Sequence, residues 1–147
     1  MSRFTDVEIL SPYAKYEVFK TAYDTVNSFV KSENLISAFV LSFSILEDRL
    51  CAALVVCSQA LNKNIKFSSI SKMQFKQRAE KLLKIGAIQQ DLHDRLLEGA
   101  YLRNKLTHEM MWRLDVFHAS HIRSFRSLIN ELQKIQRKHE KLIESKT

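Results

Sequence analysis

The chain has 147 residues, the size of one typical domain and enough to bury a core. Its two Gly and one Pro argue against β-hairpins, and its hydrophobic content of 46% excludes an intrinsically disordered chain. The net charge of +7 is compatible with RNA, DNA or anionic lipid and selects none of them. We expect a single all-α domain over residues 1–147.

Two helices are predicted in the N-terminal part. Ser11 and Pro12 suit the N-cap and the first helical position, so the first helix begins there. The second helix runs from about Glu33 to Leu61. Apolar residues recur every three or four positions along both helices, at Phe19, Tyr23, Val26, Val30, Ile36, Phe39, Val40, Phe43, Leu46, Leu50, Leu54 and Cys57.

Glu47, Asp48 and Arg49 interrupt the apolar stretch 35–56 of the second helix. Three charges at its centre argue against a membrane span and for a long core helix. The N-terminus has no apolar run followed by a cleavage site, so we expect no signal peptide. These features predict a cytoplasmic protein without a membrane segment.

Three more helices are predicted after a loop at 62–70. Ser71 and Gln74 have the spacing of a capping box, which marks the start of the third helix. The helices are expected to run from this box to about Gly86, from about Gln89 to Glu109, and from about Asp115 to Glu144. Five helices with short connections predict an antiparallel bundle.

The fourth predicted helix carries an arginine where its periodicity predicts an apolar residue. Arg103 falls in the stripe formed by Ile85, Ile88, Leu92, Leu96, Gly99, Leu106 and Met110. An unpaired charge on a buried face is costly, so Arg103 needs a partner. Glu47 and Asp48 are the expected partners, Glu47 before Asp48, and Gly99 leaves room for close helix approach. The same pair could serve structure alone, without catalysis.

Asn104 and His108 are four residues apart and share a helix face. Arg103 and His108 are five apart, about 140° around an ideal helix, and do not converge in one regular helix. Either the helix frays near Thr107, or two copies pair across a twofold axis. Histidine transfers protons near neutral pH, and arginine stabilises charge on a phosphate. With RNA, the 2′-hydroxyl can be the nucleophile, so neither a metal nor a cofactor is needed.

The stretch "LRNKLTH" at 102–108, preceded by "FKQRAEKLLKIGAIQQDLHDRLLEGAY", resembles the HEPN superfamily of small all-α domains. The resemblance covers roughly residues 72–132. It implies a metal-independent endoribonuclease of toxin or antiviral-defence type, active as a homodimer, that leaves 2′,3′-cyclic phosphate and 5′-hydroxyl ends. It further implies that Arg103 contacts the scissile phosphate, His108 transfers a proton and Asn104 positions them.

The resemblance also implies a partner, an antitoxin or a nucleotidyltransferase. Some members carry a Tyr two residues after the His, where the antitoxin modifies it, but Met110 stands here. That form of regulation is therefore in question. Lys105, Trp112 and Arg113, beside the motif, are candidate RNA-binding residues. Trp112 and Met111 would otherwise pack in the core or in a dimer interface.

Two other functional classes remain open. A non-catalytic HEPN-like module would use the same dimer cleft to bind RNA, a nucleotide or a partner protein in a regulatory role. A DNA-binding repressor is disfavoured, because no helix-turn-helix spacing is present.

Two further clusters have alternative interpretations. His118 and His121 are three residues apart, but no third ligand is apparent, so no metal site is expected. The C-terminal cations form either a solvated helix face or an RNA contact, and they are Lys134, Arg137, Lys138 and Lys141.

Overall fold

The computed structural model describes residues 12–110 and 112–146, with side chains from Thr21 onward except that of Leu114. Ser11, the side chain of Phe19, and Met111 lie outside this description. The described part contains helices and no strands, as predicted. The elements are α1 (Pro12–Lys31), α2 (Leu35–Ala60), α3 (Phe67–Lys72), α4 (Phe75–Lys84), α5 (Gln90–Glu109), the 3₁₀ turn η1 (Leu114–Val116) and α6 (Ala119–Ser145).

The segment predicted as a loop contains the extra helix α3, so the described chain has six α-helices rather than five. Ile70 is buried and anchors this short helix to the core. The guanidinium of Arg78 in α4 donates to the carbonyl oxygens of Ile70 and Ser71, at 3.2 and 3.3 Å. The Ile70 carbonyl also accepts from the backbone N–H of Met73 at 3.1 Å, so Arg78 adds a second donor there and one more at Ser71, close to the end of α3. A side chain later in the sequence therefore stabilises the turn.

The capping box before α4 lies three residues later than predicted. Gln74 is the N-cap, and its backbone N–H donates to the Gln77 side chain at 2.7 Å. The hydroxyl of Ser71 instead donates to the Ser68 carbonyl inside α3. Gly86, with φ of +81°, follows the end of α4 as predicted, because glycine tolerates this left-handed conformation.

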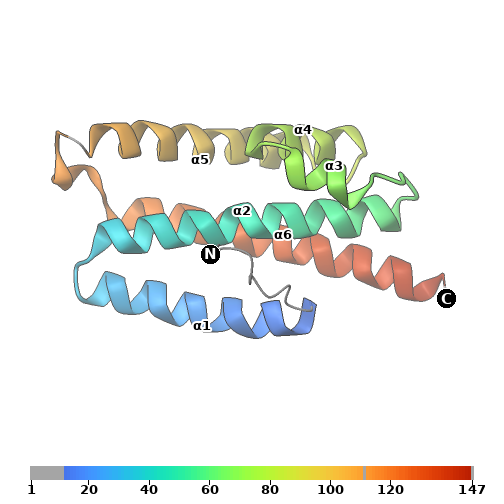
Figure 1. The fold of residues 1–147 in the computed structure, drawn as a ribbon, viewed down its shortest axis with the longest axis horizontal. Helices are drawn as coiled ribbons and strands as arrows, with labels where there is room; N and C mark the ends of the chain where they lie inside the picture. Colours follow the sequence, from blue (N-terminus) through green and yellow to red (C-terminus); the bar gives the residue numbers. More distant parts are fainter. Residues whose placement is uncertain (1–11, 111, 147) are drawn as a thin grey trace, which may run out of the picture.

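The centre of the fold is the pair α2 and α6, which lie side by side and run in the same direction (Figure 1). Phe39, near the start of α2, contacts Phe117 and Phe125, while Lys146 donates to the Ala60 carbonyl at the opposite end. A purely antiparallel bundle is therefore wrong for this central pair. The three helices between α2 and α6 return the chain to its starting end, which permits the parallel arrangement.

The remaining helices cover this pair from two sides. Figure 1 shows α1 on one side and α3, α4 and α5 on the other. Leucines along α2 pack against α6, and an aromatic cluster joins α2, α4 and α6 through Phe43, whose ring centroid is 5.3 Å from those of Phe75 and Phe125. Two residues predicted to face inward are instead exposed, namely Val40 and Met110.

Among the described residues, no helix is both long enough and apolar enough to cross a membrane. In α2, the three charges at 47–49 interrupt the apolar stretch, as noted from the sequence.

Candidate functional site

Helix α5 is regular through the whole motif and ends at Glu109. The backbone N–H of Met110 still bonds to the Leu106 carbonyl at 2.9 Å. The helix therefore does not fray near Thr107, and that alternative is wrong for this protomer. Arg103 and His108 remain about 140° apart around α5.

The guanidinium of Arg103 packs on an aromatic ring. Its Cζ atom lies 4.7 Å from the centroid of the Phe43 ring in α2, which is a cation–π contact. The side chain is half-buried, and its Nε atom is buried with no hydrogen-bond partner in the described part of the chain. A buried polar group of this kind is costly unless a ligand or a second molecule satisfies it.

The expected ion pair between Arg103 and Glu47 or Asp48 is absent from the described structure. Asp48 Oδ2 lies instead 2.8 Å from the guanidinium of Arg49, the next residue in α2. The Arg49 side chain is buried. Glu47 is half-buried one turn after Phe43, but it forms no ion pair with Arg103 among the described residues. For Asp48 the prediction failed because α2 contains its own buried arginine, which takes that carboxylate.

Asn104 and His108 are exposed on another face of α5. Tyr101 shares this face, since it is seven residues before His108, and its side chain is 68% exposed. Lys105 is also exposed, and Trp112 after the helix is 79% exposed. The structure thus brings together the amide, the imidazole and a tyrosine that the sequence analysis did not select.

Arg113, the third candidate RNA-binding residue, is engaged locally. Its guanidinium contacts the Asp115 carboxylate at 3.2 Å, and this hydrogen bond holds the pKa of Asp115 below its ordinary value. Both side chains are exposed, so the pair contributes little to stability. Arg113 is therefore a weaker candidate than Lys105.

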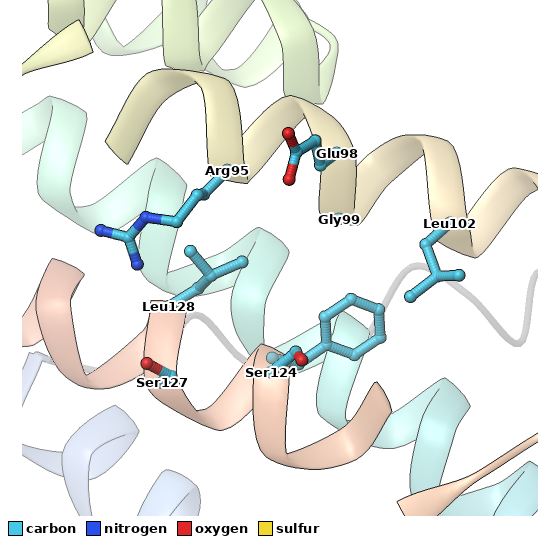
Figure 2. A pocket seen from close by; sticks show the side chains of 8 residues that line it. Arg95, Glu98, Gly99, Leu102, Ser124, Ser127 and Leu128 are labelled. Carbon is cyan, nitrogen blue, oxygen red and sulfur yellow. The ribbon is translucent and has the colours of Figure 1, made fainter. Parts of the chain in front are cut away.

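A hollow of about 280 Å³ lies between α5 and α6 (Figure 2). Figure 2 shows Leu102 of α5 and Leu128 of α6 on its walls, with Gly99 between them. Its lining residues are Arg95, Glu98, Gly99, Leu102, Ser124, Phe125, Ser127 and Leu128. Leu102 and Asn104 project about 160° apart around α5, so this hollow does not contain the polar motif residues.

Arg95 at the edge of the hollow is fully engaged. Its NH2 group donates to Glu131 of α6 at 2.8 Å, NH1 donates to the other Glu131 oxygen, and Nε donates to Asp91 at 2.9 Å. These bonds raise the pKa of Arg95, with Glu131 as the main cause. Arg95 was not among the predicted site residues, although the spacing of Asp91 and Arg95 by four residues is a helical ion-pair signal.

His118 and His121 serve the start of α6 rather than a metal site. The backbone N–H of His118 donates to Nδ1 of His121 at 3.2 Å, so Nδ1 accepts a bond from an otherwise unpaired amide. Partial burial, together with the charge of His118, lowers the pKa of His121. No group of three metal-ligating side chains occurs among the residues that the structure describes.

The candidate site therefore consists of Arg103 on one side of α5 and Asn104, Lys105 and His108 on another. Such a set can bind a phosphate and transfer a proton, provided that a second surface brings the two sides together. No protein-family model, curated protein or solved structure matches this chain.

Proposed function

We propose that the protein is a metal-independent endoribonuclease of the HEPN type, with a toxin or antiviral-defence role, that acts as a homodimer. The observation that supports this proposal is that two arginines of the same helix, α5, differ in their ion pairs. Arg95 is paired with two carboxylates, whereas Arg103 lies on Phe43 without an ion pair among the described residues. An arginine positioned by an aromatic ring and lacking a carboxylate remains available for a phosphate.

The proposed reaction uses the 2′-oxygen of RNA as the nucleophile. This oxygen forms a bond to phosphorus while the bond to the 5′-oxygen breaks, which leaves a 2′,3′-cyclic phosphate and a 5′-hydroxyl. The 2′-hydroxyl loses its proton to water, and protonated His108 donates a proton to the leaving 5′-oxygen. Arg103 stabilises the negative charge on the phosphate oxygens, and Asn104 orients the reacting groups through hydrogen bonds.

A dimer is part of this proposal because of the helix geometry. Within one α5, Arg103 and His108 diverge by about 140° and do not reach the same phosphate easily. In a twofold pair the Arg103 side of one helix can face the His108 side of the other. The half-buried guanidinium of Arg103, which has no ion pair among the described residues, supports the idea that another molecule completes this surface.

The test is cleavage of mixed cellular RNA by purified protein in excess EDTA. We compare the wild type with His108→Ala and with His118→Ala, which removes an exposed histidine outside the motif. Cleavage by the wild type and His118→Ala only, with cyclic-phosphate ends, supports the proposal. Equal cleavage by His108→Ala indicates a contaminating nuclease. Absence of cleavage by a folded, dimeric wild type overturns the enzymatic proposal.

A second candidate is a non-catalytic module that binds RNA, a nucleotide or a regulatory partner. The observation that favours it is the exposure of Tyr101 and Trp112 beside the motif. Large exposed aromatic side chains are typical of binding surfaces, including one that an antitoxin or a nucleotidyltransferase would cover. If the protein is such a module, Tyr101→Ala weakens its binding to the RNA, nucleotide or partner. Neither the wild type nor His108→Ala then cleaves cellular RNA.

A further inference from the structure

The positive charge of the chain is concentrated far from the motif. Residues 61–88 hold seven of the 23 Lys and Arg but one of the 16 Asp and Glu, so they carry most of the net charge of +7. Arg78 is bound to the end of α3, and Lys76 lies 3.9 Å from Glu80. The other cations form no ion pair among the described residues, and we call them the basic end: Lys63, Lys66, Lys72, Lys81 and Lys84.

Three lysines of the basic end line one hollow. This hollow, of about 210 Å³, lies between the loop after α2 and the end of α4, and Lys63, Lys81 and Lys84 contribute to it. No acidic residue lines it. Lys63 stands between Asn62 and Asn64, whose φ angles of 55° and 50° make a tight left-handed turn. Lysines grouped around a hollow without a carboxylate match the charge of a phosphate.

A second hollow of about 340 Å³ adjoins the first, since Ile65 lines both. Its polar lining comes from Ser58, Gln59, Asn62 and Asn64, and Phe67 of α3 completes it. The Phe67 side chain is 64% exposed, which is unusual for a phenylalanine. Amide side chains bind base edges, and an exposed aromatic ring stacks on a base.

We propose that these two hollows bind single-stranded RNA, with a base on Phe67 and the neighbouring phosphate among Lys63, Lys81 and Lys84. This inference deepens the proposed function and rests on it for the choice of RNA. A membrane is a poorer fit, because the large apolar residues of α3 and α4 other than Phe67 point into the core, as the burial of Ile70, Phe75 and Leu82 shows.

The basic end lies at the opposite end of α5 from the motif (Figure 1). His108 is near the end of α5 and Gln90 at its start, so roughly 27 Å of helix separates them. A strand that reaches both places spans several nucleotides, within the range of about 4–16 nucleotides that single-strand sites cover. The basic end would therefore hold the RNA while the motif acts on another part of it.

The experiment measures binding of a fluorescent 12-nucleotide RNA carrying 2′-O-methyl groups, which lacks the nucleophile and cannot be cleaved. The variant Lys63→Glu/Lys84→Glu is compared with Lys134→Glu/Lys138→Glu on α6, which has the same net charge. All four lysines are exposed, so both variants are expected to fold. We expect at least tenfold weaker binding for the first variant and less than threefold for the second. The slope of the logarithm of the binding constant against the logarithm of the salt concentration should decrease in magnitude by about 1.4 for the first variant only.

Phe67→Ala keeps every charge and is expected to weaken binding about tenfold. Equal weakening by the two charge variants, or no effect of Phe67→Ala, overturns the proposal. Displacement of the RNA by an equal concentration of AMP would overturn it in favour of a mononucleotide site. Binding of the wild type to phosphatidylserine vesicles but not to RNA would overturn it in favour of a membrane.

The outcome is separable from that of the nuclease proposal. RNA binding that depends on Lys63 and Lys84, with no cleavage of unmodified RNA, supports this inference and overturns the nuclease alone. Cleavage that depends on His108, with binding unchanged in the lysine variant, supports the nuclease and overturns this inference alone.

Discussion

Each half of α5 contains one half-buried arginine, and the two arginines have different partners. In the first half, Arg95 is 37% exposed and donates to both oxygens of Glu131 and to Asp91. In the second half, Arg103 is half-buried, has a buried Nε without a hydrogen-bond partner in the described structure, and contacts the ring of Phe43. Both arginines are half-buried, but only Arg95 has carboxylate partners among the described residues.

This difference separates an arginine that stabilises the fold from one that is available to a ligand. The charge of Arg95 is matched by two carboxylates, which leaves little reason for it to bind an added anion. The guanidinium of Arg103 lies on the face of the Phe43 ring. This contact uses none of its N–H groups, so they can donate to a phosphate or to a second protomer. Substitutions along the helix and in its partner α2 can test this distinction.

The largest effect is expected on the rate of RNA cleavage when Arg103 is replaced. Arg103→Ala should lower the cleavage rate by about 10²–10³-fold, since it removes a donor to the developing negative charge. Arg95→Ala should change the rate less than about threefold. A similar loss in both variants would remove the contrast between the two halves of α5.

The two acidic residues of α2 should differ in stability. Asp48→Asn is expected to lower the free energy of unfolding by about 1–3 kcal/mol, because it removes the negative charge of the carboxylate that accepts from the buried Arg49. Glu47→Gln should change it by less than about 0.5 kcal/mol, since Glu47 makes no ion pair with Arg103 in the described structure. Urea unfolding at neutral pH measures both. A larger effect for Glu47→Gln than for Asp48→Asn would indicate that Glu47 does pair with Arg103, as predicted from the sequence.

The pair of Arg95 and Glu131 should make stability depend on acid pH. The hydrogen bond from Arg95 lowers the pKa of Glu131 from its ordinary value of 4.5. The stabilisation is therefore present above about pH 4.5 and is lost as the pH falls through the lower folded-state pKa. At neutral pH, Arg95→Ala should cost about 1 kcal/mol, since both side chains are partly exposed.

Urea midpoints at about pH 7 and pH 3.5 check this dependence. The difference between the wild type and Arg95→Ala should shrink at the lower pH. A constant difference would mean that Arg95 acts through packing of its aliphatic stem rather than through Glu131.

A small effect of the opposite sign is expected at Gly99, which lies between the two arginines in the sequence. A Cβ atom there would be 3.4 Å from Leu128 Cδ1 and 3.5 Å from Phe125 Cε1, which is ordinary contact. Because alanine favours a helix over glycine, Gly99→Ala should stabilise the protein by up to about 1 kcal/mol. Thermal unfolding measures it. A clear destabilisation would show that close approach of α5 to α6 requires glycine.

Much of the secondary structure was predictable because its signals are local. The expected start of α1 at Pro12 is confirmed, and the expected α5 matches within one residue. The helix α3 was missed, since its stability depends on burial of Ile70 and on bonds from Arg78. Neither interaction leaves a periodic pattern in a segment of six residues.

The candidate site was predictable in part. The position of Arg103 in the apolar stripe predicted a side chain on a buried face, and the structure has it half-buried on the ring of Phe43 rather than paired with a carboxylate. The exposure of Tyr101 and the hollows at the basic end were not predicted. Exposure depends on where α4 and α6 cover α5, and spacing along one helix does not contain that information.

The sequence by itself determined that the described chain is helical and which faces of its longer helices are apolar, because both follow from the composition and from a period of 3.6 residues. Only the tertiary structure decided that α2 and α6 run parallel and that Asp48 pairs with Arg49. Only the tertiary structure decided that Arg103 meets an aromatic ring. The helix pairing and the contact of Arg103 with Phe43 depend on which residues from distant segments share a small volume. The Asp48–Arg49 pair joins sequence neighbours, but the burial of Arg49 that accompanies it comes from the packing of α2 in the core.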